Sequence, residues 1–398
     1  MKFIISSGVL QKSLSSISGV LISNPVVPIL ENFLLELDKG RLVASASDLQ
    51  ISMTTSISVD TDVPGKIAIP AKILLDTLKN LPEQPISFSV NIDDSMTEIT
   101  SYKGTYKLGG ELATDFPNIP VATGDNRITV SSDLLLDAIS NTLFSVGKDE
   151  MRPAMTGVFL KLEKDKLTFV ATDANRLVKY VRNDVNNEVE ATMIIPKKAM
   201  QLLKASLPSN PTEVEIQFSD SNAFFSFNQT TMACRLIDEK YPDYDSAIPL
   251  NNDKRLSVSR TELLSSLKRL IIYANKSNYQ IRYTMQQDVL TISAEDTDFA
   301  NEAQEQIIAE YEGRDMEVGF NATFMIDALT NMVGDEIELN FSDPNRACII
   351  VPREKTPEEN ILMLVMPVMI NSTINDSFDG SDEESEDEEE EVNEENEE

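Results

Sequence analysis

The stretch Leu42-Val43-Ala44-Ser45-Ala46-Ser47-Asp48 returns in similar form as Leu167-Thr168-Phe169-Val170-Ala171-Thr172-Asp173 and as Leu290-Thr291-Ile292-Ser293-Ala294-Glu295-Asp296. Each copy runs from Leu to Asp with five residues between them, and each follows a short turn of Lys, Asp, Gly or Gln. The alternating apolar residues are typical of a half-buried strand. The copies lie 125 and 123 residues apart, which indicates that whole domains recur rather than single strands.

Other segments recur at nearly the same period. Dipeptides that end in proline lie 125 residues apart, namely Phe116-Pro117, Tyr241-Pro242 and Met366-Pro367. A helix-like segment follows each of Ile69-Pro70, Ile195-Pro196 and Phe320-Asn321, and an earlier helix is marked by Leu10 and Leu14, Leu135 and Ile139, and Leu263 and Leu267. Chance recurrence of common Leu and Pro patterns is the alternative, but several independent signals at one period favour true repeats.

The sequence therefore predicts three similar domains, at 1–125, 126–250 and 251–371. We expect an α+β fold in which each domain packs two helices against antiparallel sheets of short strands. A different composition begins after residue 371: from Asp376 to Glu398 there are 15 acidic residues and no basic ones. Such a segment cannot bury a core, so we expect 372–398 to be a disordered acidic tail.

The composition argues against catalysis. The chain has no histidine, and neither Gly-x-x-x-x-Gly-Lys-Ser/Thr nor Gly-x-Gly-x-x-Gly occurs, so the usual general base and phosphate-binding loops are missing. Cys234 and Cys348 lie far apart without metal-ligand spacing. We expect no catalytic residues, no metal and no cofactor. Few cysteines, no apolar run of 18 residues and an N-terminus that turns polar by residue 6 favour the reducing cytoplasm.

The positive charge is concentrated on the expected helices. The formal net charge is −32, which by itself argues against a nucleic-acid partner. Six helix-like segments nevertheless hold 12 basic and seven acidic residues; they are 7–20, 70–80, 132–152, 196–205, 260–276 and 321–332. Ordinary solvated helix faces would also explain this pattern. If the repeats curve with their helices inside, however, a closed assembly has a basic lining that attracts phosphates without reading bases.

A ring of two chains would have a hole of suitable size for DNA. Two chains supply six domains and 12 helices, which at roughly 8–10 Å between axes make a circle about 32–38 Å across. Subtracting a helix radius of about 5–6 Å on each side leaves a hole of roughly 20–28 Å. A B-form duplex fits in such a hole.

Several further motifs resemble one family. Pro25-Val26-Val27-Pro28-Ile29-Leu30-Glu31-Asn32 is similar to the Leu-Pro-Ile-Leu-x-Asn segment of the bacterial beta sliding clamps, the beta subunits of DNA polymerase III. Asp115-Phe116-Pro117, Val170 to Asp173 with Arg176-Leu177, and Lys240-Tyr241-Pro242-Asp243-Tyr244 resemble further signatures. Val365-Met366-Pro367-Val368 resembles the Val-Met-Pro-Met near the end of family members. The resemblance covers Met1 to about Asn371.

The resemblance implies a processivity factor rather than an enzyme, with polymerase activity only by association with the holoenzyme. It implies a head-to-tail homodimer that forms a six-domain ring around duplex DNA, slides freely and is opened by an ATP-driven clamp loader. It also implies a shared pocket for short peptides of the polymerase III alpha subunit, the clamp loader, other polymerases and repair proteins, and it implies no membrane partner. Two other classes remain open: an enzyme such as a nuclease, and a repeat scaffold that never meets DNA.

Three sets of residues carry these roles if the resemblance holds. The peptide pocket comprises Met155, Thr172, Ala174, Arg176, Leu177, Pro242, Val365, Met366, Pro367 and Val368, which would otherwise be interpreted as core residues. The candidate DNA-binding residues are Lys12, Lys72, Lys79, Arg152, Lys197, Lys198, Lys204, Lys268 and Arg269. The candidate dimer interface comprises Tyr106, Leu108, Ile272 and Tyr273.

The chain also departs from the family pattern. Pro153 and Ala154 follow Arg152 where the family often has an aromatic pair, and Asn24 stands at a loop site that is often basic. On the pocket rim, Ser246-Ala247 replace the usual Arg-Val, and Met369-Ile370 stand where a terminal Arg is usual. These changes affect the expected DNA contacts and the choice of partner peptide.

Overall fold

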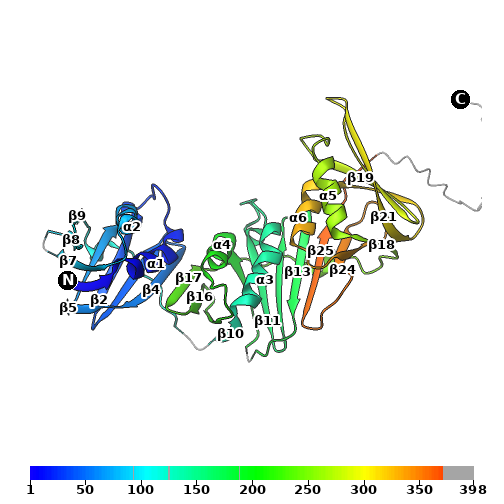
Figure 1. Ribbon diagram of the computed structural model, residues 1–398. Helices are drawn as coiled ribbons and strands as arrows, with labels where there is room; N and C mark the ends of the chain where they lie inside the picture. The colour runs from blue at the N-terminus through cyan, green and yellow to red at the C-terminus, as the bar shows by residue number, and fades with distance from the viewer. Residues whose placement is uncertain (93, 124–125, 188, 371–398) are drawn as a thin grey trace, which may run out of the picture.

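A computed structural model of the chain describes residues 1–92, 94–123, 126–187 and 189–370. The expected acidic tail, 372–398, lies outside the described residues. Figure 1 shows three similar α+β units in a row, with the N-terminus at one end and β18–β25 at the other. We call them domains 1, 2 and 3. None of the described helices is long and apolar enough to span a bilayer.

The three domains repeat one order of elements, apart from the additional strand β5 in domain 1. Domain 1 contains β1 (Lys2–Ser6), α1 (Ser7–Ile17), β2 (Asn32–Asp38), β3 (Arg41–Ser47), β4 (Ile51–Ser58), β5 (Asp60–Val63), β6 (Gly65–Pro70), α2 (Ala71–Asn80), β7 (Pro85–Asn91), β8 (Met96–Thr100) and β9 (Thr105–Gly109). Domain 2 contains β10 (Arg127–Ser131), α3 (Ser132–Thr142), β11 (Gly157–Glu163), β12 (Lys166–Thr172), β13 (Arg176–Arg182), β14 (Ala191–Pro196), α4 (Lys197–Ser206), β15 (Glu213–Phe218), β16 (Asn222–Phe227) and β17 (Thr230–Arg235). Domain 3 contains β18 (Lys254–Ser259), α5 (Arg260–Leu270), β19 (Gln280–Gln286), β20 (Val289–Asp296), β21 (Asn301–Glu312), β22 (Met316–Asn321), α6 (Ala322–Asn331), β23 (Glu336–Phe341), β24 (Cys348–Pro352) and β25 (Glu359–Val365).

The recurring Leu-to-Asp stretch forms the strands β3, β12 and β20, and its Asp makes the turn that follows. In domain 1, Asp48 Oδ1 accepts hydrogen bonds from the backbone N–H groups of Gln50 and Ile51, at 3.0 and 2.7 Å. Asp173 accepts the equivalent bonds from Asn175 and Arg176, at 3.0 and 3.1 Å. An Asp side chain that caps its own turn lets the chain reverse into the next strand. In domain 3 the turn is two residues longer: Asp296 pairs with Asn301, and its carboxylate accepts one backbone bond, from the N–H of Asp298 at 3.2 Å. The motif therefore recurs because its Asp begins a capped turn between two antiparallel strands in each domain.

Each domain has the two predicted helices, and their apolar faces are buried. Leu10 and Leu14 of α1 and Leu74 of α2 have no exposed surface. The helices of each domain pack against each other, as α1·α2, α3·α4 and α5·α6. Ser131, Ser259 and Asn321 cap the N-termini of three of the helices with side-chain oxygens, which satisfies N–H groups that the helix itself leaves free.

Two of the predicted helices were too long. The segment 132–152 is helical only to Thr142, with a 3-10 turn over Leu143–Ser145. The chain then bends so closely that a Cβ on Gly147 would lie 3.1 Å from the Met155 carbonyl oxygen, an approach that favours glycine. Likewise α5 ends at Leu270 rather than 276. Arg152 therefore lies in a loop and not on a helix face.

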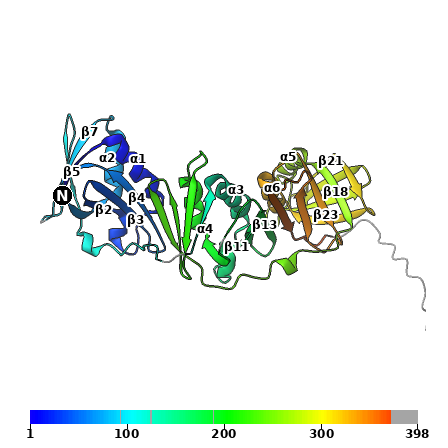
Figure 2. The ribbon, with the colours of Figure 1, turned by 90° about the horizontal axis from the view of Figure 1, so that it is seen from below.

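The sheets run across both domain boundaries. An eight-stranded sheet has the order β10-β15-β16-β17-β4-β3-β2-β6, in which β17 of domain 2 pairs antiparallel with β4 of domain 1. A 12-stranded sheet has the order β14-β11-β12-β13-β25-β24-β23-β18-β21-β20-β19-β22, in which β13 of domain 2 pairs with β25 of domain 3. Figure 2 shows these strands side by side at the two boundaries. Backbone hydrogen bonds thus join each pair of neighbouring domains along one strand pair.

Candidate functional site

The junction of domains 2 and 3 combines a strand pair with an apolar cluster. Arg176 of β13 faces Val365 of β25, and Leu177 faces Leu364. Leu177 and Leu364 are buried in one cluster with Tyr241 of the connector between the domains, and the Tyr241 hydroxyl donates a 3.3 Å hydrogen bond to the Val170 carbonyl. The connector is therefore packed against the junction that it spans.

The structure gathers most of the predicted pocket residues at this junction, with different exposure. Thr172, Leu177 and Val365 are buried, so in this conformation they are core residues. Ala174 and Met366 are exposed, and the Met366 N–H donates a 2.8 Å hydrogen bond to the Asn175 carbonyl, which joins the two domains. The remaining predicted residues, Met155, Arg176, Pro242, Pro367 and Val368, are half-buried.

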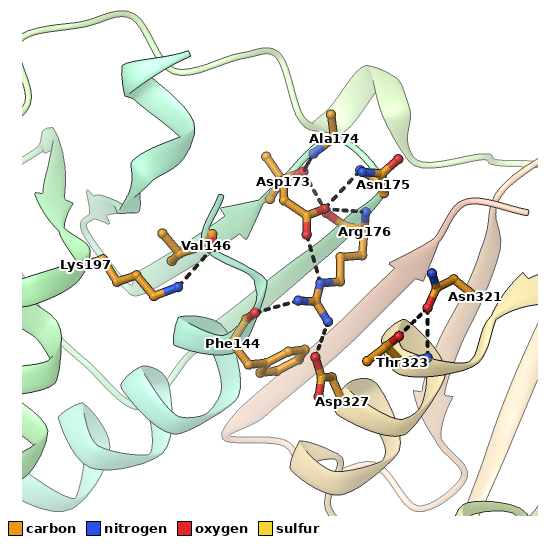
Figure 3. Close-up of polar contacts among 11 residues, drawn as sticks. Phe144, Val146, Asp173, Ala174, Asn175, Arg176, Lys197, Asn321, Thr323 and Asp327 are labelled. Carbon is orange, nitrogen blue, oxygen red and sulfur yellow. Dashed lines mark hydrogen bonds and ion pairs between the residues drawn. The ribbon is translucent and has the colours of Figure 1, made fainter. Parts of the chain in front are cut away.

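Arg176 makes three side-chain hydrogen bonds at this junction, and the one to Asp327 crosses to domain 3 (Figure 3). Its Nε donates to Asp173 Oδ2 at 3.1 Å, one terminal nitrogen donates to Asp327 Oδ2 of α6 at 2.6 Å, and the other donates to the Phe144 carbonyl at 2.9 Å. The rings of Phe144 and Phe324 lie 5.6 and 4.8 Å from the guanidinium carbon, close enough for cation–π attraction. Arg176 thus ties domain 2 to domain 3.

Sequence reasoning missed Phe144, Phe324 and Asp327 as parts of this site. Asp327 is 151 positions from Arg176, and no local pattern joins the two. A usable signal was the alignment of α2 with α6, which places an apolar residue third and an aspartate sixth in both helices, since Ile73 and Asp76 match Phe324 and Asp327.

The candidate DNA-binding residues differ in how free their charges are. Lys12, Lys72, Lys79, Lys204 and Lys268 are exposed and take part in no ion pair among the residues that the structure describes. Arg152 pairs with Asp149 at 2.8 Å, and Arg269 forms a two-pronged pair with Glu305, at 2.7 and 2.5 Å.

Lys197 and Lys198 begin α4 beside the junction of domains 1 and 2 and are only half-exposed. The Lys198 ammonium contacts Asp48 of domain 1 at 2.5 Å, so it joins two domains in addition to any role in the lining. Lys197 donates to the Val146 carbonyl at 3.3 Å. Burial, together with the charges of Lys148 and Arg176, lowers the pKa of Lys197 because each disfavours the ammonium form.

Two of the predicted interface residues lie in domain 1 and two in domain 3, the first and last domains of the row. Tyr106 and Leu108 are on β9, the last strand of the sheet β5-β1-β7-β8-β9. Leu108 is buried, while Tyr106 is 37% exposed. Ile272 and Tyr273, after α5, are 63% and 43% exposed. Such exposure of large apolar side chains beside a strand edge is typical of an interaction surface.

The described residues include no group of three or more His, Cys, Asp or Glu side chains that could hold a metal ion. The geometry is that of a binding protein: strand edges, an apolar junction and exposed lysines.

Known proteins resemble the chain along nearly its whole length. Models of the N-terminal, central and C-terminal domains of the DNA polymerase III beta subunit match residues 1–120, 129–243 and 245–369. The chain is 29% identical over 393 residues to the beta sliding clamp of Synechocystis sp., and 26% identical over 371 residues to that of Vibrio cholerae; each match covers 93% of this chain and all of the relative.

Solved structures give the same result. The DNA polymerase sliding clamp of Bacillus subtilis superimposes with a TM-score of 0.89 at 27% identity, and the sliding clamp of Pseudomonas aeruginosa bound to griselimycin with a TM-score of 0.87 at 25% identity. Both matches cover 93% of this chain and all of the other chain.

Proposed function

Since this chain belongs to the bacterial beta sliding clamp family, the beta subunits of DNA polymerase III, we propose that two copies close head to tail into a ring around duplex DNA. The chain is a processivity factor, a non-catalytic subunit with DNA and polymerase as partners. It works where the chromosome is replicated, in the cytoplasm. The observation that carries the ring is that both junctions within the chain are built alike and that the strand edges for a third junction are exposed.

The two internal junctions share one strand register. Cys234 faces Ile51 in the first and Val365 faces Arg176 in the second. Ile51 and Arg176 pair with the aspartates of their turns, Asp48 and Asp173. The residue paired with the third aspartate, Asp296, is Asn301 of β21.

The second strand of the proposed junction between two copies is β9 of domain 1. Cys234 lies opposite Ala223 in its hairpin, and Val365 opposite Cys348. Leu108 takes the same place, opposite Thr97, in the hairpin of β8 and β9.

The same register between two copies places Leu108 opposite Asn301, Lys107 opposite Glu302, and Tyr106 opposite Ala303. Lys107 and Glu302 then form a cross-strand pair of opposite charges, which stabilises antiparallel strands. A head-to-tail contact uses different surfaces on the two copies. It closes a ring of two only if the rotation that relates one copy to the next is a half turn; otherwise the copies form an open filament.

This junction also accounts for exposed apolar side chains beyond the four residues expected from the sequence. Ile73 holds the place in α2 that Phe324 holds in α6, and it is 54% exposed. Tyr102, in the hairpin before β9, and Ile308, on the same stretch of β21, are 89% and 85% exposed. Covering these groups supplies much of the association energy.

Paired cysteines test the register directly. Tyr106→Cys with Ala303→Cys should form a disulfide between copies under mild oxidation, because facing strand positions bring the Cβ atoms close enough. Tyr106→Cys with Gln304→Cys is the matched control, since neighbouring strand residues point to opposite faces. The native Cys234 and Cys348 are buried and should not compete. Cross-linking that is equal in both pairs, or stronger in the control, would contradict this register.

We propose that the exposed lysines of the helices face the hole of the ring and contact phosphates. Lys12, Lys72, Lys79, Lys204 and Lys268 are the best placed, because their charges are not already neutralised by the described residues of the chain. Arg269 and Lys198 contribute less, since Glu305 and Asp48 pair with them. Such contacts are insensitive to sequence and weaken with salt.

We propose further that the junction of domains 2 and 3 binds short peptides of the polymerase III alpha subunit, the clamp loader and other replication and repair proteins. The exposed Met366 suits a site that accepts many ligands, because methionine adapts its shape. A related clamp was crystallised bound to griselimycin. We propose that this compound binds at this junction in the present chain, and it therefore serves as the probe of the pocket.

Retention on DNA tests the function as a whole. A clamp that has been loaded onto a nicked circular plasmid should stay bound in a gel-filtration run and should dissociate once the plasmid is linearised. An enzyme would turn over its substrate without this topological dependence, and a scaffold that never meets DNA would not be retained on either form. Equal retention on circular and linear DNA would exclude an encircling ring.

A further inference from the structure

The proposed peptide pocket has walls from two domains, so its width depends on the angle between them. Thr172 and Ala174 belong to domain 2, and Met366 and Pro367 to domain 3. The backbone bonds of β13 with β25 fix the distance between the domains along one line, but the twist between two paired strands varies over roughly 10–35° among sheets, so strand pairing alone does not set the angle between the domains. A second attachment away from that line is needed to fix the angle.

Asp327 supplies that attachment through Arg176. It projects from α6 of domain 3, and its carboxylate lies 2.6 Å from the Arg176 guanidinium of domain 2 (Figure 3). The Arg176 side chain is only 12% exposed, and at least three of its five N–H donors are used by protein oxygens. Its role is therefore to hold the junction, rather than to offer a free cation to a ligand.

We propose that Asp327 is a positioning residue of the peptide pocket: through Arg176 it fixes the angle between domains 2 and 3, so that ligand binding and this junction stabilise each other. The inference rests on the proposed pocket. It follows that a ligand that bridges both walls binds more weakly when the pair is broken, and that it protects the junction when it is bound, because linkage between two equilibria is reciprocal.

The junction of domains 1 and 2 forms without this ion pair, so the pair is not a general requirement of the fold. Ile51 stands in place of Arg176 at the junction of domains 1 and 2. On α2, Asp76 matches Asp327 in helix position, and both backbone carbonyls accept a hydrogen bond from an Asn side chain four residues later. Asp76 has no ion pair within the described part of the chain. It is therefore a matched control for the same substitution.

The experiment compares Asp327→Asn with Asp76→Asn in the full chain, with griselimycin as the probe. Asn keeps the size of the side chain and removes its charge. Calorimetry should show about five- to tenfold weaker binding for Asp327→Asn, a usual size for coupling between sites, and no change for Asp76→Asn. Asp327→Glu should restore part of the affinity. A fourth variant, Met366→Glu, changes a residue of the pocket itself.

Hydrogen exchange at the junction strands distinguishes a positioning role of Asp327 from a general loss of stability. In the wild-type chain, griselimycin should slow exchange of the β13 and β25 amides, and this protection should shrink in Asp327→Asn but not in Asp76→Asn. Unchanged affinity and protection in Asp327→Asn, with binding abolished in Met366→Glu, would overturn the positioning role while leaving the pocket in place. Unchanged binding in Met366→Glu would instead refute the pocket itself.

Discussion

Replacing both Ile272 and Tyr273 with alanine should convert the ring to single chains. The two side chains are 63% and 43% exposed in the isolated chain, and full burial of a large apolar side chain is worth about 1.5–3 kcal/mol. Scaling by the exposed fractions gives about 2–3 kcal/mol for each interface. A ring contains two interfaces, so it loses about 4–6 kcal/mol, and at 1.4 kcal/mol per tenfold change the dimer Kd rises by about 10³–10⁴.

Sedimentation velocity over nanomolar to micromolar protein measures this shift. The wild-type chain should remain a dimer at concentrations where the double variant is monomeric. Leu250→Ala with Val26→Ala is a suitable control, because these side chains are 92% and 100% exposed and lie outside the proposed interface. If the Ile272 and Tyr273 variant dimerises as tightly as the wild type, or if the control dissociates equally, then these residues do not form the interface.

Three further predictions concern DNA, peptides and the acidic tail. Lys72→Ala with Lys79→Ala should lower primer-template affinity alike for all sequences and reduce the slope of log K against log salt by about 0.9 for each phosphate that the clamp no longer neutralises; fluorescence anisotropy over a salt series would detect any sequence preference, which would contradict a basic lining. Deleting Met366–Glu398 should abolish griselimycin binding, whereas deleting Ser372–Glu398 should preserve it, and equal calorimetric affinities would place the pocket elsewhere. Because it removes 15 acidic residues, the shorter deletion should also strengthen non-specific DNA binding at about 50 mM salt, with a difference that fades at several hundred millimolar; gel-shift affinities equal to those of the full chain at both salts would leave the tail without an electrostatic role.

The sequence predicted those parts of the fold that depend on local chemistry. Leu42–Asp48 could be interpreted as a strand and turn because the alternating residues and the capping aspartate act within a few positions. The course of the chain beyond α3 could not, because it depends on the close approach of Gly147 to Met155, which is made across a turn. Arg152 was consequently placed on a helix that does not reach it.

The candidate site likewise has parts that the sequence predicted and parts that depend on long-range contacts. The apolar residues of the junction came from a family resemblance that short motifs carry, and the structure brings most of them together. The partners of Arg176 lie on α6 and after α3, and their proximity depends on how two domains dock, which no periodicity records. Comparison of the repeats with one another would have identified Ile73 and Asp327, because matched helix positions take matched places at the junctions.

The junctions of the proposed ring differ in how firmly they are closed. Inside each chain a continuous polypeptide crosses the boundary, and at one boundary the ion pair of Arg176 with Asp327 closes it further. Between chains the place of Arg176 falls to Asn301, an uncharged residue, so the proposed seam has strand pairing, apolar contact and the cross-strand pair of Lys107 with Glu302, but no counterpart of the half-buried Arg176–Asp327 pair. A loader that pulls on the ring would therefore part it at the seam. Each proposed peptide pocket lies within one chain, so the proposed ring could open for DNA to enter while partner peptides stay bound.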